Sequence, residues 1–223
     1  MPDWQRADAF VDDNVVFLEE DLDNRLAAID EARSAIDEGL TETDTAAVAS
    51  AVKEVAAAAR GAAISALKLA VLKEAQAGLA AGHGVGVEER DLLPVLPPTG
   101  PLEPTTTRSV LDHLGESGPD ATPDEVQREF TAALKEVVAR AADTLRDAAE
   151  CVGSTLTAAR EAAADGKLTT TVQTAYAIEA AAATLLPAQQ EWLDAAGEQA
   201  NVDANGVPQG LESWLRENGR RQN

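Results

Sequence analysis

The stretch Ala62-Ala-Ile-Ser-Ala-Leu-Lys-Leu-Ala-Val-Leu72 is apolar on nearly every side when it is drawn as a helix. A helix that is apolar all round has to be covered all round by other parts of the structure. The pattern extends from Asp44 to Gly82, and Thr41, Thr43 and Asp44 are all suitable N-caps. We therefore expect a central helix over 44–82, against which the other long helices pack. Its two apolar faces comprise Val48, Val52, Val55, Ala59, Ala62, Ala66 and Leu69 on one side and Ile64, Leu67 and Val71 on the other.

A second apolar stripe precedes the central helix. Apolar residues recur at three- and four-residue steps, and the acidic residues fall mostly outside the stripe, which predicts a helix over 10–38. Arg33 interrupts the stripe, and Gly39 is a residue type that commonly ends a helix. The stripe comprises Val11, Val15, Leu18, Leu22, Leu26, Ile29, Ile36 and Leu40.

Two further long helices are expected in the second half of the chain. Thr122-Pro-Asp-Glu125 combines an N-cap, a proline at the first helical position and a glutamate at the third. The helix that begins there should run to Ala164 and end at Asp165-Gly166, with Gly153 as a point where it could bend. The fourth helix should start near Thr169, be kinked or restarted at Pro187, and end near Gly197. Its apolar residues are Val172, Tyr176, Ala183 and Leu186, and a last short helix is expected over 209–217.

A proline-rich segment separates the two pairs of helices. Seven of the ten prolines lie between Pro94 and Pro123. Proline removes backbone donors and restricts the preceding residue, so the segment 83–121 should be largely extended. Its apolar residues predict that it docks on its own helices or on a neighbouring subunit.

These patterns predict an all-α fold with no strands. The expected architecture is an antiparallel bundle of four long helices, made of two helical hairpins joined by a long crossover. The expected organisation is an N-terminal hairpin over 1–82, an extended arm over 83–121, a C-terminal hairpin over 122–200 and a tail with a short helix over 201–223. Together they should form one domain.

The chain is strongly acidic. It carries 39 acidic and 18 basic residues, a formal net charge of -21, and only five of the basic residues are lysine. Such a charge destabilises a compact fold by self-repulsion at low salt, whereas at about 1 M salt the Debye length is only about 3 Å. Acidic, lysine-poor and alanine-rich composition together indicate a halophile, for example an archaeon with a cytoplasm near salt saturation.

The composition also limits the partners. Nucleic acid binding needs a basic stripe, and none is present. The apolar run around Ile64–Leu72 is shorter than the roughly 20 residues of a membrane span and contains Lys68. A single cysteine, Cys151, allows no internal disulfide, and Met1-Pro-Asp-Trp4 does not resemble a secretory signal. We expect no membrane insertion and a location in the cytoplasm or in a particle assembled inside the cell.

No group of residues forms a recognisable catalytic, cofactor or metal motif. His83 and His113 lack the Glu-x-x-His spacing of di-iron bundles. Cys151 is most simply a small packing residue on an alanine-rich helix. The loop Gly82-His-Gly-Val-Gly86 follows a helix, whereas phosphate loops precede one. The sequence therefore predicts a protein that is not an enzyme and has no cofactor.

The expected function is assembly. Tryptophan is enriched at contact surfaces, and the three tryptophans lie in terminal segments or after the expected kink. The first hypothesis is a homo-oligomeric structural subunit, such as a virion connector, neck or coat component. The second is a helical adaptor, regulator or granule-surface protein, and the tryptophans could also simply cap the ends of the bundle. The candidate protein-interface residues are Trp4, Leu92, Leu93, Val95, Leu96, Leu102, Trp192 and Trp214.

Overall fold

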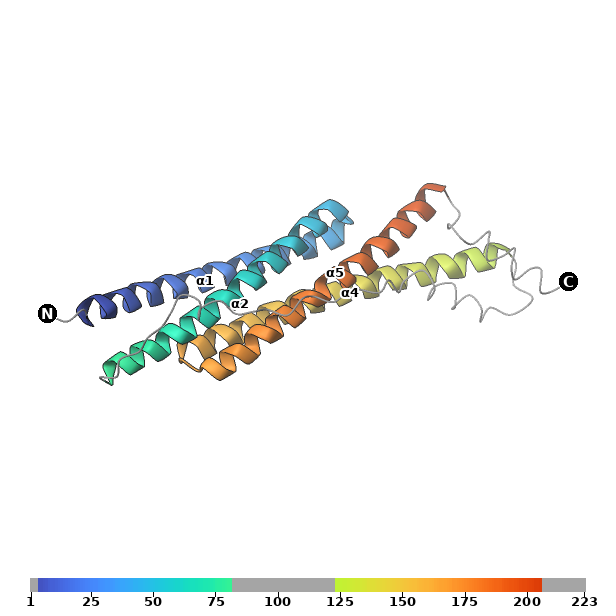
Figure 1. The fold of residues 1–223 in the computed structure, drawn as a ribbon. Helices are drawn as coiled ribbons and strands as arrows, with labels where there is room; N and C mark the ends of the chain where they lie inside the picture. The colour runs from blue at the N-terminus through green and yellow to red at the C-terminus, as the bar shows by residue number, and fades with distance from the viewer. Residues whose placement is uncertain (1–3, 82–122, 206–223) are drawn as a thin grey trace. The chain divides into compact units, whose positions relative to one another are not determined.

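The structure, a computed structural model, describes residues 4–81 and 123–205, and all regular structure in these two ranges is helical. The all-α prediction is therefore confirmed for the described residues. The expected arm over 83–121 and the short helix over 209–217 lie outside them. The helices are α1 (Trp4–Glu42), α2 (Thr45–Ala80), α4 (Pro123–Ala164) and α5 (Leu168–Asn205) (Figure 1).

The first two helices form a hairpin with a very short turn. Thr43 has a positive φ of 58°, and the carboxylate of Asp44 accepts hydrogen bonds from the amides of Ala46 and Ala47, both 3.0 Å long. Asp44 is thus the N-cap of α2, as its residue type predicts. The expected stop at Gly39 is wrong, because α1 continues to Glu42.

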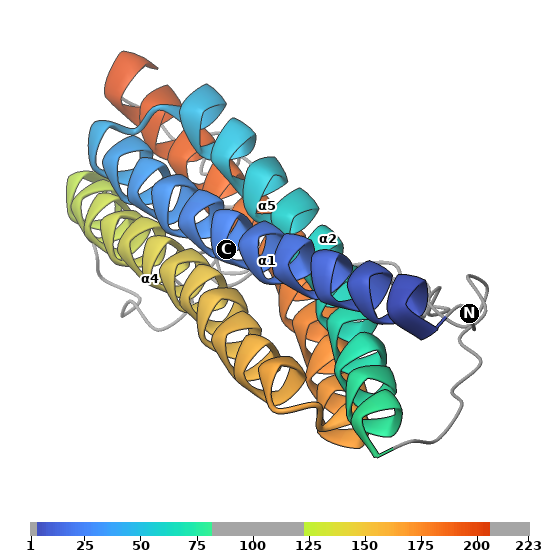
Figure 2. The same cartoon turned by 90° about the vertical axis from the view of Figure 1, so that its left-hand side faces the viewer.

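Gly39 has a different purpose inside α1. A Cβ at this position would lie 2.8 Å from Cγ2 of Val48, which is fully buried at the start of α2. The glycine therefore lets α2 return closely along α1, and Figure 2 shows the two helices running side by side. Tertiary packing has kept within the helix a residue type that local preference places at its end.

The central stretch of α2 is enclosed as predicted. Each of the residues from Gly61 to Lys73 is buried or half-buried, and none is exposed. The residues expected on the first face are all buried, including Val48, Val52 and Val55 at 0% exposure. The expected apolar stripe of α1 is buried too, apart from Leu26, which is half-buried. The prediction of a covered central helix is therefore confirmed.

The chain divides into two compact units. The first comprises Met1–Pro101 and Asp147–Leu185, and the second comprises Leu102–Arg146 and Leu186–Asn223. The described part of the first unit thus contains α1, α2, the last part of α4 and the first part of α5. The division differs from the expected hairpin domains, because α4 and α5 each contribute to both units.

The turn between α4 and α5 has the geometry that its sequence predicts. Gly166 has a φ of 65°, a left-handed conformation that glycine adopts without steric cost. The amide of Lys167 donates to the carbonyl of Ala162 over 2.9 Å, and that of Gly166 to Ala163 over 3.0 Å. This pair of bonds is a Schellman motif, which satisfies the last carbonyls of α4.

The expectations for α5 need three corrections. The helix is continuous through Pro187, and it passes Gly197 to end at Asn205. The expected apolar residues Tyr176 and Leu186 are 47% and 50% exposed. The residues buried in their place follow a different register and include Thr171, Ala175, Ile178, Leu185 and Trp192.

Candidate interaction surface

A polar cluster joins α1 to α2 inside the first unit. Asp21 accepts hydrogen bonds from Nε of Arg25, over 2.7 Å, and from the hydroxyl of Ser65 on α2, over 2.6 Å. The guanidinium of Arg25 lies directly over Gly61, where any Cβ would collide with it. Partial burial acts to raise the pKa of Asp21, but the hydrogen bonds from Arg25 and Ser65 outweigh it and hold that pKa below its ordinary value.

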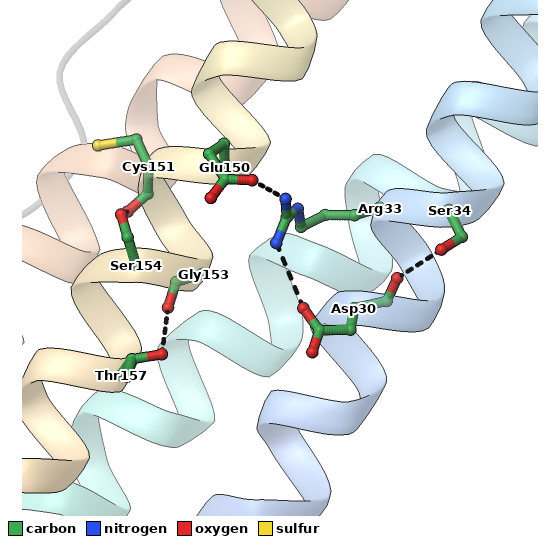
Figure 3. A network of polar contacts seen from close by, with 8 residues as sticks. All are labelled: Asp30, Arg33, Ser34, Glu150, Cys151, Gly153, Ser154 and Thr157. Atoms are coloured by element: carbon green, nitrogen blue, oxygen red, sulfur yellow. Dashed lines mark hydrogen bonds and ion pairs between the residues drawn. The ribbon is translucent and has the colours of Figure 1, made fainter.

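A second arginine on α1 repeats this arrangement against α4. Arg33 pairs with Asp30 on its own helix and with Glu150 on α4, as Figure 3 shows. A Cβ at Gly153 would lie 3.2 Å from Nη1 of Arg33 and 3.8 Å from Cγ2 of Ile29. The sequence suggested a bend at Gly153, but α4 is continuous there, and the glycine makes room for the arginine. Both arginines therefore fix the alignment of neighbouring helices.

Other polar contacts between helices of the first unit are also structural. Nζ of Lys73 on α2 pairs with Glu19 over 2.9 Å, and Nε2 of Gln76 donates to Asp12 over 2.6 Å. Nε of Arg160 on α4 donates to Asp23 over 2.5 Å, and this bond raises the pKa of the guanidinium. Partly exposed pairs of this kind contribute about 0–1 kcal/mol each. They set alignment and do not gather reactive groups around a space.

The described residues contain no group of three or more side chains that could hold a metal ion. Glu179 on α5 is 8% exposed, and its Oε1 has no hydrogen-bond partner in the part of the chain that the structure describes. One buried carboxylate without a second ligand does not form a metal site. Cys151 is exposed on α4, and in Figure 3 its sulfur points away from the Arg33 network. His83 and His113 lie outside the described residues.

Two of the predicted interface residues fall within the described ranges. Trp4 is the first residue of α1. Trp192 is on α5 with its side chain 1% exposed, so its indole is packed within the chain. A role for Trp192 between subunits stays a prediction, and its replacement would damage the core as well as any contact. The other predicted residues, Leu92, Leu93, Val95, Leu96, Leu102 and Trp214, lie outside the described residues.

The first unit has an exposed surface on α5 that lacks charge. Between Lys167 and Glu191 the only charged residue is Glu179, and it is buried. At 100° per residue, the exposed residues from Thr169 to Thr184 fall within one third of the helix circumference. We call this surface the α5 outer face. It comprises Thr169, Thr170, Gln173, Tyr176, Ala177, Ala180 and Thr184.

The α5 outer face contrasts with the rest of the protein surface. The chain carries one acidic residue in about every six, whereas this face, about 22 Å long, carries none. Contact surfaces between proteins are depleted in charge and enriched in tyrosine, and Tyr176 lies at the edge of this face. The uncharged run was visible in the sequence, but assigning Tyr176 to the core concealed its meaning.

A second surface that the sequence analysis missed lies on α1. Phe10 and Phe17 are each 64% exposed, and they share one side of the helix because they are seven residues apart. We call this pair the α1 aromatic face. Val16, 54% exposed, lies on an adjoining side. The two phenylalanines fall outside the predicted apolar stripe, which was the available signal.

By length and composition α2 could cross a membrane, but the most apolar part of this helix is 61% buried inside the protein. The enclosed core helix of a water-soluble protein passes the same test, so the observation is weak evidence for a membrane span.

No family model, no curated protein and no solved structure matches the chain.

Proposed function

We propose that this chain is a homo-oligomeric structural subunit of a halophile, without catalytic activity, that works in a virion connector, neck or coat or in a comparable particle. In this proposal the four helices form an antiparallel bundle, and the proline-rich segment is the crossover between two hairpins. The oligomer assembles inside the cell and needs neither a cofactor nor nucleic acid.

The observation that supports this function best is the uncharged α5 outer face. Two copies that each carry a net charge of -21 repel one another least where both surfaces lack charge. A face of alanine and threonine also allows helices to approach closely, and Tyr176 supplies a larger contact group. Salt near saturation reduces the remaining repulsion, since the Debye length falls to about 3 Å at 1 M.

The same surface would also serve the alternative function, a helical adaptor, regulator or granule-surface protein. In that case a different protein or an apolar body would cover the α5 outer face. The two proposals differ in what the purified protein does alone, because only a self-assembling subunit forms a defined oligomer without a partner.

Light scattering after gel filtration in about 3 M KCl tests the proposal. Ala180→Glu places a carboxylate in the middle of the α5 outer face. An unpaired charge in a buried contact costs about 3 kcal/mol or more, which is over a hundredfold in an association constant. We expect wild-type protein to form a closed oligomer and Ala180→Glu to be monomeric with its helix content retained.

Ala28→Glu is the matched control, because Ala28 is an exposed alanine on α1 and the change in charge is the same. This variant should assemble like the wild type. A monomeric wild-type protein refutes self-assembly and supports the adaptor. Loss of the oligomer in both variants shows that total charge, and not the α5 outer face, controls assembly.

A further inference from the structure

The α1 aromatic face is the most exposed aromatic surface that the structure describes. Its two phenylalanines lie two helical turns apart, about 10 Å along the axis, with Asp13 exposed between them. One exposed apolar residue needs no explanation, but two on the same side of a helix form a patch that an apolar group can cover.

The chain leaves α2 close to this face. The bond from Gln76 to Asp12, 2.6 Å long, and that from Lys73 to Glu19, 2.9 Å long, place the last turns of α2 beside residues 12–19 of α1. The helix ends at Ala80, about one turn beyond Gln76. The chain that follows therefore begins its path next to Phe10.

The next apolar stretch along the chain is Leu92-Leu-Pro-Val-Leu-Pro-Pro-Thr-Gly-Pro-Leu102, which contains no charged residue. It lies outside the described residues. The twelve residues from Ala80 to Leu92 can span about 40 Å, about four times the length of the face. We propose that the segment Leu92–Leu102 docks on the α1 aromatic face of its own chain.

Charge favours this segment over a second copy of the protein. The face is bordered by the exposed carboxylates of Asp12, Asp13 and Glu20. Pairing two such faces would bring like charges together, whereas the segment brings none. The segment is also tethered nearby, which gives it an effective concentration of about 1 mM without any partner. This docking concerns a different surface from the α5 outer face and does not depend on oligomer formation.

Cross-linking tests the proposal in the full chain at high salt. Asp13→Cys and Thr99→Cys are combined with Cys151→Ser and treated with a short bifunctional maleimide. Both new cysteines leave the apolar residues of face and segment intact. We expect an internally cross-linked monomer to form about tenfold faster than in the control, in which Thr99→Cys is combined with the native, exposed Cys151.

Adding Phe10→Ser and Phe17→Ser to the test variant should reduce its rate to that of the control. Both side chains are largely exposed, so helix content should be retained, and circular dichroism checks this. A cross-linked dimer would overturn the proposal, because it would show that the face meets another copy. Equal rates in test and control proteins, or an unchanged rate after the serine substitutions, would also overturn it.

Discussion

Two glycines inside the helices of the first unit should respond in opposite ways to the same substitution. Gly39→Ala and Gly153→Ala each add one methyl group within a long helix. Alanine is favoured over glycine in a helix interior by about 1 kcal/mol, so local preference alone predicts that both variants are more stable. The contacts that the new Cβ meets should separate them.

The expected difference follows from what surrounds each position. At Gly39 the Cβ would lie 2.8 Å from Cγ2 and 3.3 Å from the backbone nitrogen of Val48, and neither atom can move freely. Val48 is fully buried and β-branched, so it has one favoured rotamer in a helix. Overpacking of this kind costs about 1–3 kcal/mol, which leaves a net loss of about 1 kcal/mol.

At Gly153 the nearest atom is Nη1 of Arg33, the end of a flexible side chain, at 3.2 Å. A shift of a few tenths of an ångström relieves that contact and weakens a partly exposed ion pair worth about 0.5 kcal/mol. Subtracted from the helix preference, this leaves Gly153→Ala more stable than the wild type by about 0.5 kcal/mol.

Urea denaturation at constant KCl, followed by circular dichroism at 222 nm, measures the difference. With a slope of about 2 kcal/mol per molar urea, the 1.5 kcal/mol between the variants separates their midpoints by about 0.7 M. Urea is uncharged, so it leaves the screening of the acidic surface unchanged. Equal midpoints, or a higher one for Gly39→Ala, would refute the close approach of α1 and α2 at the turn.

Three further outcomes are expected. In falling salt the wild-type protein should lose helix well above 0.1 M, because screening of its net charge of -21 fails; an unchanged helix signal at 10 mM would contradict the halophile proposal. Asp21→Asn should lower the free energy of unfolding by about 1 kcal/mol at pH 7. Since the folded-state pKa of Asp21 is lowered, this deficit should hold above about pH 4 and shrink as the pH falls further, and a constant deficit down to pH 2 would refute it. Trp192→Ala should destabilise the protein by about 3–5 kcal/mol in urea, as expected for a buried indole, and a loss below 1 kcal/mol would show that its pocket is not a core.

The helix starts were predictable because their signals are local. Asp44 bonds to the amides that follow it, and Gly166 takes the left-handed conformation that its residue type allows. The central helix was equally clear, since a stretch without a polar side has only one stable environment in water. The helix ends at glycine were wrong, because Gly39 is used for close packing and Gly197 meets nothing within 4 Å.

The core register of α5 was not predictable with the same ease. Alanine gives little contrast between inside and outside, and the adjacent Leu185 and Leu186 support two different stripes. The repeat of Ile178, Leu185 and Trp192 at seven-residue steps was the available signal for the observed register. Choosing the other stripe placed Tyr176 in the core and thereby concealed the α5 outer face.

The enclosure of α2 from Gly61 to Lys73 has a consequence for how this sequence can vary. Along most helices, tolerance to substitution rises and falls every three or four residues as positions turn from core to water. Thirteen consecutive positions of α2 have no such outward phase, so substitutions with larger or charged side chains should fail throughout. Drift in this protein would therefore concentrate on the outward sides of the other helices, and this one stretch would persist as the mark of common descent.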